Sequence, residues 1–243
     1  MSSFTARDLN TALWSAADEM RKIMSADVYK DYLLGLVFYK ALSDKMLVEA
    51  YDLLNDEKPE SLDAAQIAYT EALTDGSWED LSLELNNRFG CVIHPRRTFT
   101  AFYNQINART FMLSELRQAF RDIEAASGGT YEGLFEDFDI DSKDLGKTPD
   151  KRNEMISSVI KALAHIDFND YPEDALGDAY EYLIAQFASE SGKKAGEFYT
   201  PQSVLADHCP PGYSRAKHEV RLYRVRPGHG VRIVALANPQ PNP

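Results

Sequence analysis

The sequence predicts a mainly α-helical protein, an N-terminal helical bundle with little or no β-sheet. Apolar residues recur at helical spacing through most of the first 200 positions. The alternation of Val and Ile with polar residues that is typical of strands is nearly absent before residue 205. Hydrophobic residues make up 44% of the 243-residue chain, which is enough to bury a core, and no apolar run approaches the ~18 residues of a membrane-spanning helix.

Two helices are predicted at the N-terminus. A variant of the capping box at residues 5–8 precedes the first helix. Five apolar residues then fall on one helical face: Leu9, Leu13, Ala16, Met20 and Met24. Residues 25–27 break this helix and cap the next, which continues to about residue 54. Its most apolar part, residues 32–42, is too short to span a membrane and contains Lys40, so we predict a buried central helix.

Shorter helices are predicted in the rest of the first 190 residues. These segments are residues 60–73, 78–87, 99–107, 113–126, 150–165 and 173–189. The helix over 60–73 is followed by Asp75 and Gly76, and that over 113–126 by Ser127, Gly128 and Gly129. Such residues adopt the turn conformations that end helices.

The charge of the chain limits the partners that it binds by itself. The formal net charge is −12, whereas non-specific affinity for DNA requires clustered Lys and Arg against the phosphates. We therefore expect weak DNA binding by the isolated chain. The first ten residues lack the apolar region of a secretory signal, and two cysteines do not form a disulfide framework, so we expect a cytoplasmic protein.

Four aspartates in one segment suggest a calcium loop: Asp137, Asp139, Asp141 and Asp144. An EF-hand requires Gly at the sixth position of its loop and a carboxylate at the twelfth. Counted from Asp137, these positions hold Ser142 and Thr148, so a structural loop is predicted. His94 and His165 are isolated, which favours packing or surface roles, and His208 with Cys209 has no second ligand pair at zinc spacing.

Basic and aromatic residues alternate in residues 94–111. The set comprises His94, Arg96, Arg97, Phe99, Phe102, Tyr103, Arg109 and Phe111. One interpretation is a contact with DNA or another subunit through phosphate contacts and stacking. The other, which the helical spacing favours, places the aromatic residues in the core and the arginines toward solvent.

A polar, glycine-flanked segment at residues 192–202 follows the predicted helix over 173–189. Phe198 and Tyr199 offer flat apolar faces, and the flanking glycines let the backbone approach a ligand closely. Pro201 fixes the turn and permits a new helix after it. We predict that this segment forms one wall of a ligand site, in which Lys193 and Lys194 could meet a carboxylate or phosphate.

Several of these stretches resemble one protein family. The run GKKAGEFYTPQSV, with GDAYEYLI upstream, resembles the entry to the methyltransferase domain of the modification (HsdM-type) subunits of type I restriction-modification systems. LWSAADEMRK, YLLGLVFYKALSDK and GLFEDFDIDSKDLG resemble the N-terminal helical domain of that family. The resemblance covers residues 8 to 204, and its Phe-Tyr-Thr-Pro block is the most specific part.

The resemblance implies an N6-adenine DNA methyltransferase that uses S-adenosylmethionine. In the family, a helical domain precedes an α/β methyltransferase domain, and the matching block helps to bind the cofactor. The cofactor-binding residues implied for this chain are Glu197, Phe198, Tyr199, Thr200, Pro201 and Gln202. Implied partners are the specificity subunit, the restriction subunit, a second modification subunit and DNA through the complex, with no membrane.

The sequence departs from the family after residue 204. It contains neither the Asp-Pro-x-x-Gly-Ser-Gly loop nor the Asn-Pro-Pro-Phe/Tyr motif, so no catalytic residue is assigned. Residues 205–243 hold six of the eleven prolines, and back-translation of residues 221–236 in a shifted frame can spell GFTVYDPAMGSGSLL. We therefore expect a frameshift near residue 204, with a genuinely divergent tail as the alternative.

The expected organisation has three parts. Residues 1–170 form the helical domain, residues 171–204 begin the methyltransferase domain, and residues 205–243 are an aberrant, disordered tail. The function expected is that of a truncated modification subunit, inactive by itself. The alternative is a non-catalytic helical module that binds a specificity subunit or a DNA-bound partner.

Overall fold

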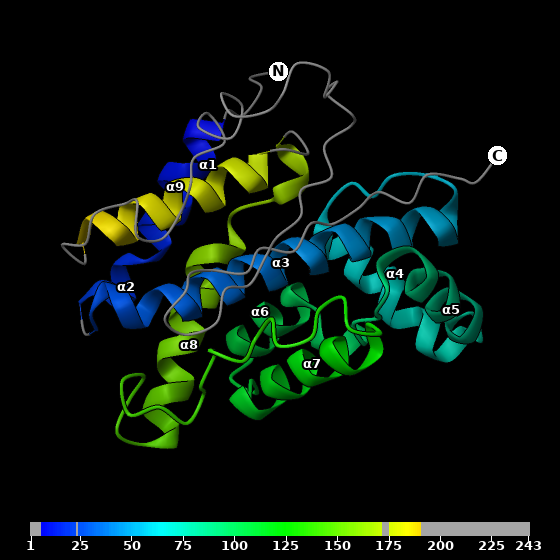
Figure 1. Cartoon of the computed structure of the whole chain (residues 1–243). Helices are drawn as coiled ribbons and strands as arrows, with labels where there is room; N and C mark the ends of the chain where they lie inside the picture. Colours follow the sequence, from blue (N-terminus) through cyan, green and yellow to red (C-terminus); the bar gives the residue numbers. More distant parts are fainter. Residues whose placement is uncertain (1–5, 23, 172–174, 191–243) are drawn as a thin grey trace, which may run out of the picture.

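The computed structural model describes residues 6–22, 24–171 and 175–190, and these residues form helices and connecting turns with no β-strand (Figure 1). The mainly helical prediction is therefore confirmed. The elements are α1 (Ala6–Ala16), α2 (Asp18–Arg21), α3 (Ala26–Asn55), α4 (Leu62–Asp75), α5 (Trp78–Phe89), η1 (Pro95–Arg97), α6 (Phe99–Asn107), α7 (Leu113–Ala126), α8 (Pro149–Ala164), η2 (Phe168–Asp170) and α9 (Ala175–Glu190). The predicted tail, residues 205–243, lies outside the described residues.

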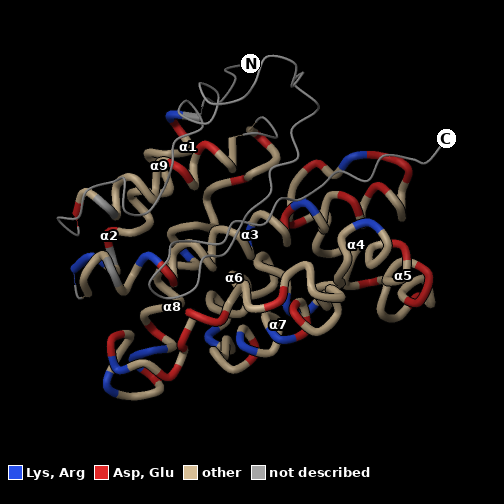
Figure 2. The backbone as a smooth tube through the Cα atoms, viewed as in Figure 1, with Lys and Arg blue, Asp and Glu red and all other residues tan. Residues whose placement is uncertain are grey.

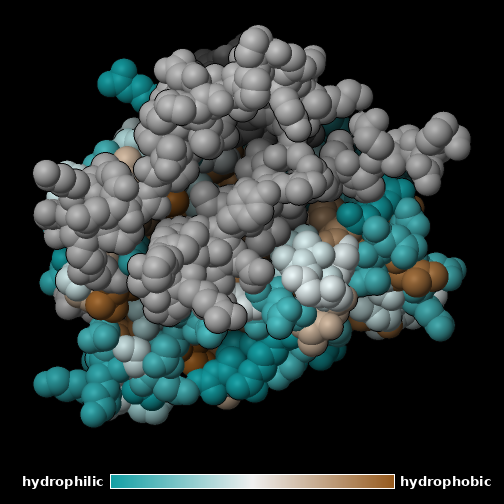
Figure 3. All heavy atoms as spheres, in the orientation of Figure 1, coloured by the Kyte–Doolittle hydropathy of each residue, from teal (hydrophilic) through white to brown (hydrophobic). Residues whose placement is uncertain are grey.

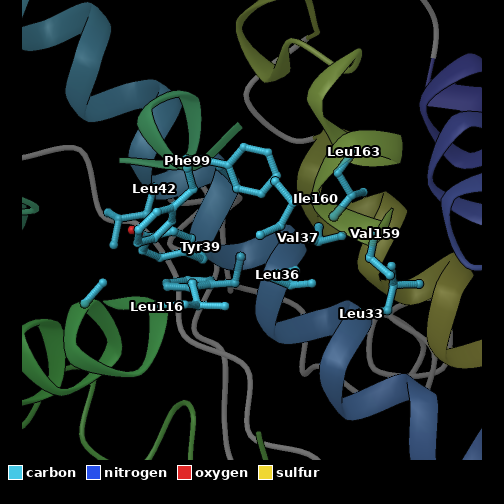
Figure 4. Packing of buried hydrophobic residues seen from close by; sticks show 14 of the residues in the cluster. Leu33, Leu36, Val37, Tyr39, Leu42, Phe99, Leu116, Val159, Ile160 and Leu163 are labelled. Carbon is cyan, nitrogen blue, oxygen red and sulfur yellow. The ribbon is translucent and has the colours of Figure 1, made fainter. Parts of the chain in front are cut away.

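Helix α3, of 30 residues, is the central helix, and α4, α5, α6, α8 and α9 all pack on it. Figure 4 shows its apolar side chains between α6, α7 and α8, with Tyr39 among them. Leu33, Leu36 and Leu42 are fully buried, as the apolar run at residues 32–42 predicted. The middle of α3 is apolar on several sides, and because residues 36–44 are all buried, this part presents no face to solvent.

The helix ends follow ordinary capping chemistry. The hydroxyls of Ser61, Thr98 and Thr148 each accept a hydrogen bond from a backbone N–H in the first turn of α4, α6 and α8. Gly76 and Gly90 follow α4 and α5 in the left-handed conformation, with φ of 91° and 72°. Gly76 agrees with the break predicted there, whereas no break was predicted at Gly90.

The predicted first helix is divided into α1 and α2. Its expected face is buried, because Leu9, Leu13 and Met20 have no exposed surface. The break lies at Ala17, whose N–H donates to the carbonyl of Trp14 at 3.2 Å. No Gly or Pro marks this turn, so the apolar pattern gave no sign of it.

A connection without regular structure, residues 127–148, packs aromatic side chains onto α3 and α7. Phe135 stacks on Phe120 with ring centroids 3.9 Å apart, and Phe138 meets Tyr32 edge to face at 5.0 Å. Gly35 permits this approach, since a Cβ there would lie 2.9 Å from the Phe138 ring. The absence of a side chain on α3 thus creates the seat for this connection.

Helix α9 closes the bundle at the opposite end of the sequence. Figure 1 shows it beside α1, and it also packs on α3. Its buried positions include Ala179, Leu183 and Phe187, one turn apart along one face. The segment that precedes the predicted ligand wall is therefore part of the helical body.

Candidate functional site

The six predicted cofactor residues, Glu197 to Gln202, lie outside the described residues, as do Lys193 and Lys194. The last described residue, Glu190, comes seven positions before Glu197. Helix α9, predicted over residues 173–189, is observed from Ala175 to Glu190. The described residues therefore show how the chain is held immediately before the predicted site.

The end of α9 is tied to the N-terminal helices through the carboxylate of Glu190. The Tyr29 hydroxyl donates a hydrogen bond to Glu190 Oε2, and Arg21 Nη1 lies 3.3 Å from Glu190 Oε1. Arg21 also pairs with Asp18, and its guanidinium lies 4.2 Å from the centroid of the Trp14 ring. Burial, followed by the hydrogen bond to Glu190, raises the pKa of Tyr29, so its hydroxyl remains a donor.

Aromatic contacts extend this attachment along the seam between α1 and α9. Phe187 lies 6.0 Å from Trp14 and 5.3 Å from Tyr29 between ring centroids. Tyr182 meets Trp14 edge to face at 6.4 Å, and the Tyr180 hydroxyl donates to the Leu34 carbonyl at 2.6 Å. This cluster was not predicted, because its α9 residues lie more than 140 positions after Trp14, Tyr29 and Leu34, and no local spacing relates the two groups.

A buried ion pair lies in the middle of α3. Lys40 Nζ is 2.6 Å from Asp44 Oδ2, and the two side chains are 2% and 0% exposed. Burial raises the pKa of Asp44 to about 6, against the opposing influence of Lys40. The ammonium also faces the rings of Phe99 and Phe168, at 4.9 and 5.8 Å from the centroids. Phe168 belongs to η2, so the pair supports the connection between α8 and α9.

This pair was also missed from the sequence. Lys40 was recognised within the buried helix, but its partner four residues later was not. An opposite charge at that spacing would have been the available signal, since residues four apart on a helix are neighbours.

The basic and aromatic segment at residues 94–111 is divided between core and surface. Phe99 and Phe102 are buried, which confirms the core interpretation for them. Arg97 forms ion pairs with Glu115 at 2.9 Å and Asp122 at 2.7 Å. Most of this segment therefore serves the fold.

Arg96 and Arg109 behave differently from Arg97. Both are exposed, and neither makes an ion pair with any residue that the structure describes. Arg109 has a φ of 61°, in the left-handed region that non-glycine residues rarely adopt. Among the predicted basic and aromatic residues, these two remain available for a partner.

The two isolated histidines have structural contacts. His94 Nδ1 accepts a hydrogen bond from the Arg96 N–H at 3.2 Å, which begins η1. Burial, with the nearby Arg97 and Arg96, lowers the pKa of His94. The exposed His165 meets Tyr103 edge to face at 6.4 Å.

The aspartate-rich loop has local partners of its own. Asp139 Oδ1 accepts from the Asp141 N–H at 2.9 Å, and Asp141 pairs with Arg117. Across residues 6–22, 24–171 and 175–190, no group of three or more His, Cys, Asp or Glu side chains is arranged to hold a metal ion. Within the same residues, every helix is too short or too polar to cross a membrane.

Comparisons with known proteins match two family profiles in sequence order. Residues 9–163 match the HsdM N-terminal domain, and residues 171–207 match the N-6 DNA Methylase family. The boundary between the two matches falls between α8 and α9.

Two curated relatives are methylase subunits of type I restriction enzymes. The MpnII subunit of Mycoplasma pneumoniae is 28% identical over 210 residues, covering 79% of this chain and 37% of the relative. The MjaIX subunit of Methanocaldococcus jannaschii is 27% identical over 203 residues, covering 81% and 34%. The chain thus spans little more than a third of the length of these relatives.

A solved structure supports the same relationship. The methyltransferase subunit of a type I restriction-modification system from Streptococcus thermophilus superposes with a TM-score of 0.76 and 50% sequence identity. The match covers 82% of this chain and 42% of that subunit.

Proposed function

Since the chain belongs to the HsdM N-terminal domain family, we propose that it acts as part of the modification subunit of a type I restriction-modification system. The observation that carries the proposal is the 50% identity to a solved methyltransferase subunit, at a TM-score of 0.76. The two family matches in sequence order support it further. The activity, substrate and partners below are proposed for the assembled enzyme.

The proposed reaction is methyl transfer from S-adenosylmethionine to the exocyclic N6 of adenine in DNA. Such an enzyme removes the target base from the stacked duplex before it reacts. We propose that Glu197, Phe198, Tyr199, Thr200, Pro201 and Gln202 contribute to the cofactor site. When bound, the cofactor supplies the methyl group, and Phe198 and Tyr199 would supply apolar faces to the cofactor.

The helical body has a positioning role in this proposal. Helix α9 directly precedes the cofactor segment in the sequence, and its last residue is held by Arg21 and Tyr29. We place the helical domain at residues 1–170 and the start of the methyltransferase domain at residues 171–204. Because α9 packs on α1 and α3, the two proposed domains share a core at this point.

The polypeptide with the printed sequence is proposed to be inactive by itself. No Asn-Pro-Pro-Phe/Tyr motif occurs in it, and in the family that motif binds the target adenine. We propose that it works in the cytoplasm with a specificity subunit, a restriction subunit and a second modification subunit, and reaches DNA through them. Its net charge of −12 predicts weak affinity for DNA when the chain is alone, so that firm binding depends on the complex.

Co-expression with the specificity subunit of the same system tests the proposal. We expect the two chains to co-purify, and we expect the purified chain alone to add no methyl group to adenine in a duplex. Transfer of radioactive methyl from S-adenosylmethionine to DNA is the readout. Absence of the complex from a well-folded preparation would contradict the proposal, and methylation by the chain alone would contradict its inactivity.

The alternative is a non-catalytic helical module that binds a specificity subunit or a DNA-bound partner. The continuous buried cluster that joins residues of α1 through α9 favours it, because these helices pack as one body. Under this alternative the complex forms, but a complete enzyme assembled around the chain shows no dependence of methylation on Glu197 or Tyr199.

A further inference from the structure

The outer face of α6 differs in charge from the rest of the protein. Residues 85–114 contain no Asp or Glu, although the chain as a whole has 38 acidic residues and a net charge of −12. Figure 2 shows acidic residues on many of the helices, whereas α6 carries no charged residue. Helix α6 itself therefore adds no charge of either sign beside the cations that border it.

Two of the arginines in this acid-free segment are used within the fold. Arg88 pairs with Glu84 at 2.7 Å and also with Glu49. Arg97 pairs with Glu115 and Asp122. The other two, Arg96 and Arg109, are exposed and have no carboxylate partner among the described residues.

The packing of α8 brings a third cation to the same face. Tyr103 of α6 meets His165, and Asn153 Nδ2 donates to the Phe111 carbonyl at 3.3 Å. These contacts make α8 antiparallel to α6. Lys161 lies one turn before His165, the residue that meets Tyr103, and it is exposed, with no ion pair to any described residue.

Arg96 borders α6 on the other side. The Gln105 Nε2 donates to the Arg96 carbonyl at 2.8 Å, and Gln105 lies across the helix from Tyr103. The exposed Asn104 and Asn107 lie between the two flanks. We call this surface the α6 face: Arg96, Tyr103, Asn104, Asn107, Arg109 and Lys161.

The backbone of Arg109 provides an independent observation. Arg109 lies two residues after the end of α6 with a φ of 61°, and its N–H donates to the Ile106 carbonyl at 3.1 Å. Gly or Asn commonly occupies such a position, because the left-handed conformation strains other side chains. Strained residues cluster at functional sites, and the arginine side chain is what distinguishes this residue from a glycine.

The composition of the α6 face selects the kind of partner. Of the exposed large apolar side chains among the described residues, Ile67 and Leu83 lie on α4 and α5, and Met112 borders this face. Where the described residues are visible in Figure 3, hydrophilic side chains surround small, separate apolar patches. Protein–protein interfaces are built around an apolar or aromatic core, whereas protein–DNA interfaces are polar and positively charged. Guanidinium, ammonium and amide groups all donate hydrogen bonds to phosphate oxygens.

We infer that the α6 face binds the phosphodiester backbone of duplex DNA. Arg96, Arg109 and Lys161 contact phosphates, and Asn104 and Asn107 donate further hydrogen bonds between them. The contacts position the duplex and carry no sequence information, which leaves recognition of the target to another subunit. This inference rests on the proposed function, because duplex DNA is the substrate proposed there.

The test is fluorescence anisotropy of a labelled duplex titrated with the full chain at about 50 mM salt, then at rising salt. Arg109→Gly and Lys161→Ala are each expected to weaken binding about fivefold, with the slope of log affinity against log salt about 0.9 shallower per lost phosphate contact. Lys58→Ala removes an exposed cation between α3 and α4, and we expect it to bind as the unaltered chain does.

Arg109→Gly separates loss of DNA binding from loss of folding, because glycine relieves the backbone strain at this position while the cation is lost. Reduced DNA binding with an unchanged or higher melting temperature supports the inference. Three results would overturn it: no binding by the unaltered chain at low salt, variants that match Lys58→Ala, or displacement of DNA by polyglutamate at equal charge, which indicates an acidic protein partner.

Failure of this inference can be told apart from failure of the proposed function. If the chain co-purifies with the specificity subunit while the α6-face variants bind DNA like the control, the surface assignment is wrong and the function stands. If the α6 face binds DNA but no specificity subunit associates, the proposed function is wrong and the surface stands.

Discussion

The α1–α9 seam and the α6 face both carry arginine side chains, but these side chains differ in their partners. At the seam, Arg21 meets Glu190, and its guanidinium lies over Trp14. At the α6 face, Arg109 and Arg96 have no carboxylate partner among the described residues. A cation satisfied within the chain indicates architecture, whereas an exposed cation that pairs with no carboxylate indicates a surface left for a partner.

Truncation of an aromatic side chain in the α1–α9 seam is expected to have the largest effect on stability. Phe187 is 4% exposed and packs against Trp14 and Tyr29. Phe187→Ala should lower the free energy of unfolding by about 3 to 5 kcal/mol, since it removes the ring and leaves a cavity. Urea denaturation measures this change. Ser189→Ala, on the same helix but exposed, is the control, and equal stability of the two variants would contradict the seam as a structural unit.

The buried pair in α3 sharpens the contrast between internal and surface charges. Lys40→Met leaves Asp44 buried without its partner and should lower the free energy of unfolding by about 3 kcal/mol. Replacing both residues, with Lys40→Met and Asp44→Leu, should recover much of the loss, because no unpaired charge remains. If the single variant is as stable as the unaltered protein, the pair does not support η2.

The same pair predicts a pH dependence. The pKa of Asp44 is raised to about 6 by burial, above its ordinary value of 3.8. A raised carboxyl pKa gives stability that is fully present below the unfolded pKa and is lost as the pH rises through the folded pKa. Between pH 4 and 7, the free energy of unfolding of Asp44→Asn should therefore rise relative to that of the unaltered chain. A constant difference, measured by urea denaturation across this range, would show that Asp44 does not titrate there.

Removal of a single hydrogen bond at the seam is a milder change. Tyr29→Phe keeps the ring against Phe187 but removes the donor to Glu190. We expect a loss of about 1 to 2 kcal/mol, because the bond is charge-assisted and half-buried. A double-mutant cycle with Glu190→Gln isolates the pairwise energy. Additive effects would mean that the two groups do not interact.

The smallest expected change in stability is at the α6 face, and it has the opposite sign. Arg109→Gly should raise the free energy of unfolding by about 0.5 kcal/mol, since relief of the left-handed strain outweighs the flexibility that glycine adds. Thermal denaturation with Arg96→Ala as the neutral comparison measures it. A loss of more than about 1 kcal/mol would place Arg109 among the structural residues.

The helices were predicted well from the sequence, because each one carries its own local signals. The apolar face of residues 9–20, the uniformly apolar run around Leu36 and the glycine after α4 all act locally. The division between α1 and α2 at Ala17 was not predicted, since the turn there contains no residue that favours turns. The packing of Phe138 against Gly35 was not predicted either, because this packing depends on tertiary contacts.

The candidate sites divide along the same line. The cofactor segment could be proposed from its residues and from the family resemblance, and it stays a prediction because residues 197–202 lie outside the described part of the chain. The contacts of Glu190 with Arg21 and Tyr29 join residues from both ends of the described chain, so no spacing in the sequence revealed them. Residues 94–111 were recognised as basic and aromatic, but only the fold shows that Arg97 is paired and Arg109 is exposed.

Hydrogen exchange of the full chain, with and without duplex DNA, compares the two regions in one measurement. We predict that amides of α1 and α9 are protected equally in both states, whereas residues 104–110 and 157–165 gain protection when DNA is added. Protection gained along α9, or no gain at the α6 face under conditions where DNA is bound, would contradict this prediction.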